Sequence, residues 1–199
     1  MKRIAVFASG SGTNAENLIR YFRTSPLGRV RLVLTNKPDA YVISRAQSHG
    51  IETVVFRREQ LCETGEVLSI LKQKKIDFIV LAGFLWLIPA SILDAYAGRI
   101  VNIHPALLPR HGGKGMYGRR VHEAVIDSGD EESGITIHYL NSRYDEGDII
   151  FQATCPVEPG DTPETLAEKI HSLEYAYYPE VVEQLLKRGQ GIHGDAADN

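Results

Sequence analysis

An amide and an imidazole stand two residues apart at the end of an apolar run, Ile-Val-Asn-Ile-His-Pro at 100–105. Because side chains at i and i+2 of a strand point to the same side, Asn102 and His104 are predicted to project together, and Pro105 ends the strand. An amide N–H can donate to a developing oxyanion, and an imidazole moves protons near neutral pH. The pair suits acyl-group chemistry, although an isolated Asn-x-His is more often satisfied by turn backbone.

A carboxylate that could complete this pair is Asp145, in the turn Arg-Tyr-Asp-Glu-Gly-Asp between two predicted strands. Beside His104 it would raise the imidazole pKa and orient the ring, whereas alone it is more often a plain turn residue. His138 either supports this site or is a satisfied core histidine. Glu174 is either a ligand-binding side chain or part of a solvated helix face.

A glycine-rich turn, Ser-Gly-Ser-Gly-Thr-Asn at 9–14, follows the first predicted strand. Gly10 and Gly12 allow backbone N–H groups to point outward, and the next helix adds about half a positive charge at its N-terminus. Thr13 and Glu16 fit a capping box that would start this helix. The loop lacks the Walker A ending and is shorter than the dinucleotide fingerprint, so it indicates either a site for one phosphate or a turn without a ligand.

The elements that must position these residues alternate between strand and helix. Strand-length apolar runs occur at 3–8, 30–35, 53–56, 77–82 and 100–104, and helical periods at about 14–24, 41–49, 64–74 and 90–97. This alternation predicts an α/β domain with a single doubly wound, mostly parallel sheet and helices on both faces.

The second half of the chain departs from this alternation. We expect a mobile glycine-rich loop at 112–118, a helix at 119–128, strands at 134–140 and 148–157 with the last one antiparallel, and a helix at 162–187 interrupted at Pro179. One domain is predicted over 1–188, followed by a polar tail at 189–199 that frays.

Composition excludes several functional classes. The 199 residues are 43% apolar, enough for one well-buried domain, and the net charge of −3 without charged runs argues against nucleic acid as a partner. Cys62, Cys155 and the histidines lack metal-ligand spacing, so no metal site is expected. Neither a signal peptide nor a membrane span is visible, which predicts a cytoplasmic protein. The oligomeric state stays open.

Four segments taken together resemble the folate-dependent formyltransferases: 9–14, 81–84, 100–109 and 145–147. The most specific element is Asn-Ile-His-Pro, followed by Leu-Leu-Pro and, about forty residues later, by Asp-x-Gly. The resemblance covers about 2–188 and implies a formyltransferase-type Rossmann-like fold. It also implies transfer of a formyl group from 10-formyltetrahydrofolate, as cosubstrate, to the amine of glycinamide ribonucleotide in de novo purine biosynthesis.

The resemblance further implies roles for individual residues. The catalytic trio would be Asn102, His104 and Asp145. The substrate phosphate would be held by Ser11, Gly12, Thr13 and Asn14, and the ribose by Glu174. The pterin of the folate would be enclosed by Leu85, Trp86, Leu87, Ile88, Tyr144, Glu146, Gly147 and Asp148. Two departures stand out, because Trp86 takes a place where bacterial members often have Arg, and the 112–118 loop differs from the shorter loop of some members.

The expected reaction is direct attack of the amine on the formyl carbon through a tetrahedral intermediate, with Asn102 and protonated His104 as oxyanion donors. The alternatives are a non-catalytic module that binds a phosphate ligand, a formyltransferase acting on a nucleotide sugar, and, less favoured, a nicotinamide-dependent dehydrogenase. Relatives that act on methionyl-tRNA or hydrolyse formyltetrahydrofolate would need an additional domain, which 199 residues are not expected to hold.

Overall fold

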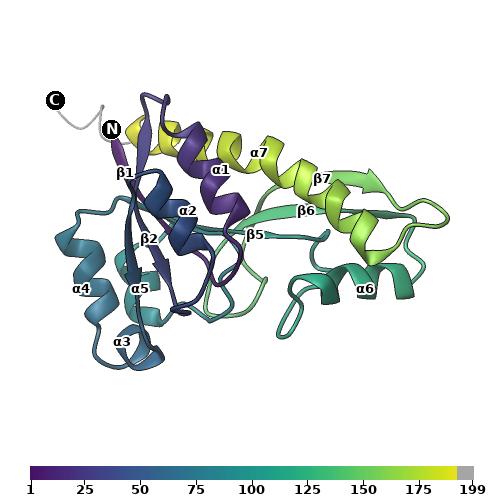
Figure 1. Ribbon diagram of the computed structural model, residues 1–199, viewed down its shortest axis with the longest axis horizontal. Coiled ribbons are helices and arrows are strands. Elements are labelled where there is room, and N and C mark those ends of the chain that lie inside the picture. Colours follow the sequence, from purple (N-terminus) through teal and green to yellow (C-terminus); the bar gives the residue numbers. More distant parts are fainter. Residues whose placement is uncertain (192–199) are drawn as a thin grey trace, which may run out of the picture.

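A seven-stranded sheet forms the centre of the molecule, with strand order β3-β2-β1-β4-β5-β6-β7 (Figure 1). The computed structural model describes residues 1–191. The strands are β1 Lys2–Phe7, β2 Gly28–Thr35, β3 Glu52–Val55, β4 Phe78–Leu81, β5 Ile100–His104, β6 Glu132–Tyr139 and β7 Ile149–Pro156. The first five are parallel, whereas β6 is antiparallel to β5 and β7 to β6. The predicted fold class is therefore confirmed, including its late antiparallel strand.

Helices cover both faces of this sheet. They are α1 Thr13–Tyr21, α2 Val42–Ser48, α3 Arg58–Cys62, α4 Glu66–Gln73, α5 Ala90–Ala95, α6 Arg119–Asp127 and α7 Pro163–Gly191. Because strand side chains alternate, β1 sends Ile4 and Val6 into a core shared with α1, α2 and α7. It sends Ala5 and Phe7 into a second core shared with α3, α4 and α5.

Helix α7 runs through Pro179 without the predicted interruption. A proline inside a helix removes one backbone hydrogen bond, but here its neighbours are held by packing. Tyr178 is fully buried and its hydroxyl donates to Leu81 O at 2.7 Å, and Val182 is fully buried one turn later. The helix extends to Gly191, so the predicted boundary at 188/189 falls inside it, and residues 192–199 of the expected tail lie outside the described residues.

The start of α1 also differs from the expectation, since Gly12 is the N-cap and no capping side chain bonds there. Gly12 has a φ of 75°, and a Cβ at this position would overlap with Val42 of α2. Glu16 cannot complete a capping box because its carboxylate pairs with Arg20, Arg45 and His49. Close contact between the loop and α2, which local spacing does not reveal, decides where this helix begins. The short helix α3 was likewise not predicted.

Candidate active site

A cavity of about 650 Å³ opens where the parallel strands β1, β4 and β5 end, which we call the carboxyl end of the sheet. It is walled by the glycine-rich turn after β1, the segment after β4, the loop before α6, the loop between β6 and β7, and one face of α7. Ligands of doubly wound folds bind at this end of the sheet, where loops from several strands converge.

Asn102 and His104 project into this cavity from β5, as their spacing predicts. The antiparallel strand β6 places His138 directly opposite Asn102, with 3.2 Å between Asn102 Nδ2 and His138 Nε2. The other ring nitrogen, His138 Nδ1, donates to Tyr139 O at 2.8 Å, so in the neutral imidazole Nε2 accepts one N–H of Asn102. His138 thus orients the amide of Asn102 toward the cavity.

Asp145 lies between two imidazoles. Its carboxylate approaches His104 Nδ1 at 3.5 Å and His138 Nε2 at 3.6 Å, and it accepts the backbone N–H of Gly113 at 2.9 Å. Burial acts to raise the pKa of Asp145, but the two imidazoles and the N–H of Gly113 together lower it below its usual value. The side chain is therefore a carboxylate at neutral pH, held beside the predicted partner His104.

The surroundings of His104 differ from the expectation that its ring is protonated. Its side chain is 3% exposed, and burial lowers its pKa, although Asp145 and the carbonyl of His111 act in the opposite direction. Nε2 donates to His111 O at 2.8 Å, so Nδ1, on the side of Asp145, is the nitrogen available to exchange a proton. The lowered pKa favours the neutral ring at neutral pH.

The predicted phosphate loop and Glu174 are brought to one wall of the cavity, which Ser11, Gly12, Thr13 and Asn14 all line. Asn14 Nδ2 donates to Glu174 Oε2 at 2.8 Å, although 160 residues separate them. Glu174 is 5% exposed and also pairs with His171 Nδ1 at 2.9 Å, which raises the pKa of His171. The loop and the long helix therefore form one continuous wall of the cavity.

Two histidines of this wall were not predicted as site residues. His171 lines the cavity one helical turn before Glu174, a spacing that could have identified it. His122, on α6, is 4% exposed and its Nδ1 has no hydrogen-bond partner among the described residues. Nothing in the local sequence distinguishes His122, because α6 reaches the cavity only through the tertiary fold.

The proposed folate residues divide into two groups. Leu85, Trp86, Leu87, Ile88 and Tyr144 line the cavity, and the Trp86 ring packs with its centroid 6.3 Å from those of Phe56 and Phe84. Glu146, Gly147 and Asp148 do not line it. Glu146 pairs with Arg143 at the surface, and a Cβ at Gly147 would overlap with the carbonyl of Tyr139, which indicates a tight backbone approach there.

The glycine-rich segment 112–118 contributes Gly113 to Gly118 to the lining of the cavity. Gly113, Gly115 and Gly118 have positive φ, a conformation that favours glycine, and Gly113 is the residue bonded to Asp145. This contact ties the segment to the catalytic candidates, while its predicted mobility stays a prediction.

Within residues 1–191, no group of three or more His, Cys, Asp or Glu side chains has the arrangement of a metal site. The helices of the same part of the chain include none that is long and apolar enough to cross a membrane.

Comparison with known proteins yields a consistent set of relatives. The family model described as formyl transferase matches residues 2–182. A chloroplastic phosphoribosylglycinamide formyltransferase of Arabidopsis thaliana is 43% identical over 187 residues, 91% of this chain and 64% of that protein, so the chain spans just under two thirds of this relative. The phosphoribosylglycinamide formyltransferase of Bacillus subtilis is 35% identical, covering 94% of this chain and 95% of that protein. A crystal structure of phosphoribosylglycinamide formyltransferase from Bacillus halodurans has a TM-score of 0.85 at 39% identity, covering 97% of this chain and 100% of that chain.

Proposed function

Because the chain belongs to the formyl transferase family, we propose that it transfers a formyl group from 10-formyltetrahydrofolate to the amine of glycinamide ribonucleotide in purine biosynthesis. The single observation that supports this most directly is the cluster formed by Asn102, His104, His138 and Asp145 at the carboxyl end of the sheet. A phosphate-binding module without chemistry has no use for an amide, two imidazoles and a carboxylate that approach one another at 3.2–3.6 Å.

The cluster suits direct transfer. Attack of the amine on the formyl carbon forms a C–N bond and turns the carbonyl oxygen into an oxyanion, to which the free N–H of Asn102 donates. Asp145, ionised at neutral pH, takes the proton that the attacking nitrogen loses. It passes this proton to the folate nitrogen as the bond between that nitrogen and the formyl carbon breaks and the oxyanion returns to a carbonyl. Protonation of His104 at Nδ1 lets this ring donate to Asp145, so a proton can pass between the two groups.

The two substrates have distinct walls in the same cavity. We assign the phosphate of the ribonucleotide to residues 11–14, where Gly12 precedes the N-terminus of α1, and its ribose to Glu174. The flat pterin is assigned to the apolar segment 85–88 and Tyr144, which line the cavity beyond the cluster. Lys37 and Arg143 at the rim add positive charge on the side where anionic ligands enter.

The direct test measures the absorbance change of the folate as it loses its formyl group, with glycinamide ribonucleotide present or absent. We expect turnover that requires the ribonucleotide. Folate deformylation that ignores it, or tight phosphate binding without turnover, would contradict the proposal in favour of a hydrolase or a binding module, and turnover with a nucleotide sugar instead would change the substrate.

The phosphate assignment is tested with the dephosphorylated riboside of the same substrate. We expect kcat/KM to fall by at least about tenfold, because each charge-assisted hydrogen bond to the phosphate contributes about 1.5–3 kcal/mol. Thr13→Ala should raise KM for the ribonucleotide more than KM for the folate. Equal kcat/KM for the two substrates would remove the loop from substrate recognition.

We further propose that the reaction requires no metal and takes place in the cytoplasm, although two plant relatives are chloroplastic by name. Full activity after extensive dialysis against a chelator is the expected result. Activity that is lost on chelation and returns with Zn²⁺ or Mg²⁺ would overturn the first point.

A further inference from the structure

A second cavity, of about 450 Å³, lies at the opposite end of the sheet, where β1, β2 and β3 begin, which we call the amino end. We propose that it binds an oligophosphate anion of the di- or triphosphate class, at a site separate from the proposed active site. Its lining holds five cationic side chains against one carboxylate, Glu52: Arg3, Arg23, Arg29, Arg31 and Lys74. The chain as a whole has a net charge of −3, so this concentration of positive charge is local.

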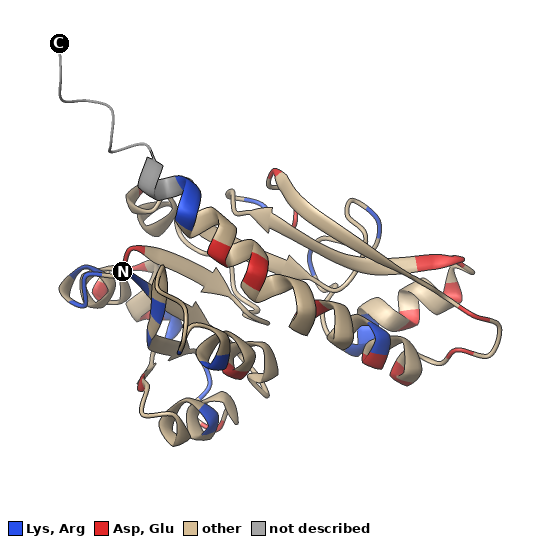
Figure 2. Cartoon of the chain, turned by 90° about the horizontal axis from the view of Figure 1, so that it is seen from above, with Lys and Arg blue, Asp and Glu red and all other residues tan. Residues whose placement is uncertain are grey.

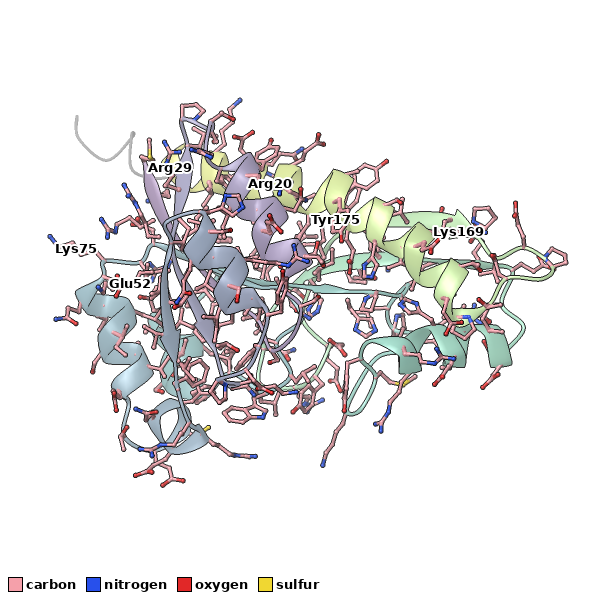
Figure 3. The ribbon with its side chains drawn as sticks, in the orientation of Figure 1. Arg20, Arg29, Glu52, Lys75, Lys169 and Tyr175 are labelled. Carbon is pink, nitrogen blue, oxygen red and sulfur yellow. The ribbon has the colours of Figure 1, made fainter. Side chains whose placement is uncertain are left out.

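The elements that supply these cations are far apart in sequence. Arg3 comes from β1, Arg29 and Arg31 from β2, and Lys74 from the end of α4. Figure 2 shows Lys and Arg positions near the N-terminus, where β1 begins. In Figure 3 the labelled residues Arg29 and Glu52 lie on the side of the molecule away from α6.

No carboxylate of the described residues pairs with the arginines of the cavity. Lys74 pairs with Glu52 at 2.7 Å, whereas none of the four arginines has a carboxylate within ion-pair distance among the residues that the structure describes. Nε of Arg3 is buried and has no hydrogen-bond partner in this part of the chain. A buried donor without an acceptor costs free energy, and an anionic oxygen in the cavity would remove that cost.

An irregularity in β2 contributes to the cluster. Ile4 of β1 pairs with Val30, but the next residue, Ala5, pairs with Leu32, so Arg31 is an extra residue in β2. Such a bulge redirects the side chain of the extra residue. Here it adds an exposed arginine to the cavity beside Arg29, which is itself the register partner of Arg3.

The helix C-termini beside the cavity can neutralise part of the arginine charge but not all of it. The C-termini of α1, α2 and α4 lie at the amino end of the sheet, and each attracts cations with about half a negative charge. Arg29 is used in this way, since its Nη1 donates to Arg23 O just after α1. The remaining arginines exceed what the helix ends can neutralise, which leaves a net positive cavity.

The chemistry of the lining indicates oligophosphate rather than a single small anion. Guanidinium groups bind phosphate oxygens through pairs of N–H donors, and several of them around one cavity match a ligand with several phosphates. A nucleoside triphosphate and a free tripolyphosphate share this feature. They differ because only the nucleoside has an apolar part that can pack on the wall formed by Ile19 and Ile51.

The test is calorimetric titration with orthophosphate, diphosphate, tripolyphosphate and ATP, comparing the wild-type chain with two double variants of equal charge change. Arg29→Gln/Arg31→Gln removes two arginines of the cavity, and Arg57→Gln/Arg58→Gln removes two exposed arginines that line neither cavity. We expect affinity to increase from orthophosphate to tripolyphosphate. The first double variant should weaken tripolyphosphate binding by at least about tenfold and the second by less than about twofold.

Thermal unfolding checks that each variant is folded. If Arg29→Gln/Arg31→Gln unfolds, the single change Arg31→Gln, at an exposed position, replaces it. ATP binding tighter than tripolyphosphate would identify a nucleotide, and equal affinities would identify the free oligophosphate, both within the proposal. Equal weakening by the two double variants, no weakening by either, or tighter binding of an RNA oligonucleotide than of tripolyphosphate would overturn it. The titrations measure binding without turnover, so their outcome is independent of the proposed reaction.

Discussion

The two ends of the sheet hold cavities of opposite construction. At the carboxyl end, backbone N–H groups at the start of α1 add positive potential to that of Lys37 and Arg143 at the rim, and the candidate catalytic side chains stand on strand ends and loops. At the amino end the helices present their C-terminal carbonyls, so positive potential there must come from arginine side chains on β1, β2 and the turn after α1.

This difference is the physical basis for proposing chemistry at one end and binding at the other. Backbone donors and buried side chains are fixed by the fold, and catalysis needs groups that do not reorganise as charge develops. Long arginine side chains are adaptable, which suits the capture of a polyanion but not the positioning of a reacting atom. Substitutions at the two ends therefore test whether the roles divide in this way.

The catalytic cluster should show the largest effect. Asn102→Ala, His104→Ala and Asp145→Ala are each expected to lower kcat by about two orders of magnitude or more, because the donor, the carboxylate and its imidazole act as one unit. The double change His104→Ala/Asp145→Ala should cost far less than the product of the single effects.

The loss of kcat is measured by steady-state turnover of each purified variant, and thermal unfolding checks that the variant is folded. Asp127→Ala, at the exposed end of α6, is the control that removes a carboxylate without touching the cavity. Variants that unfold while their folded fraction turns over normally would show that the cluster is structural.

The second largest effect should be a difference in stability between glycine-to-alanine changes at the two ends of the sheet. A Cβ at Gly147, in the loop of the carboxyl end, would overlap with backbone of Tyr139, so Gly147→Ala is expected to lower the free energy of unfolding by about 3 kcal/mol. At the amino end, a Cβ at Gly28 would meet Leu186 Cδ1 at 2.6 Å, the tip of a side chain that can move, so Gly28→Ala should cost about 1 kcal/mol. Urea unfolding gives both values, and the reverse order would show that the carboxyl end is the more adaptable one.

The Glu174 wall should show a smaller effect confined to substrate binding. Glu174→Gln keeps the shape of the side chain but weakens its pairing with His171 and Asn14. We expect KM for the ribonucleotide to rise by about tenfold with kcat little changed, since one charge-assisted hydrogen bond contributes about 1.5 kcal/mol. A fall in kcat with unchanged KM would instead place Glu174 among the groups that act in the transition state.

Acid stability should show the smallest effect. The hydrogen bond from His49, with Arg45 and Arg20, outweighs burial and lowers the pKa of Glu16 from 4.5 to about 2. Because the folded-state value is the lower one, this stabilisation is complete above pH 4.5 and is lost as the pH falls toward 2. Glu16→Gln should therefore reduce the free energy of unfolding near pH 6 and flatten its dependence on pH between these values, as denaturant unfolding at several pH values can measure. An unchanged slope would mean that the contacts linking α1 to α2 contribute nothing.

Several features of this protein were determined by the sequence alone. The alternation of apolar strands with helical periods predicted the doubly wound sheet, because these periods follow from which faces must be buried. The i, i+2 spacing of Asn102 and His104 predicted that they share one side of β5, since a strand leaves no other arrangement. The glycines at residues 9–14, which directly follow an apolar run, predicted a loop at the end of β1, and this too depends only on neighbouring residues.

The tertiary structure decided what depends on distant contacts. It placed His138 against Asn102 through an antiparallel register, and it kept α7 helical across Pro179 because Tyr178 is buried. It also gathered Arg3, Arg29 and Lys74 around one cavity, although the sequence contains no charged run. Local patterns express the conformational preferences of neighbouring residues, whereas these pairings follow from how whole elements pack, and their partners lie tens of residues apart along the chain.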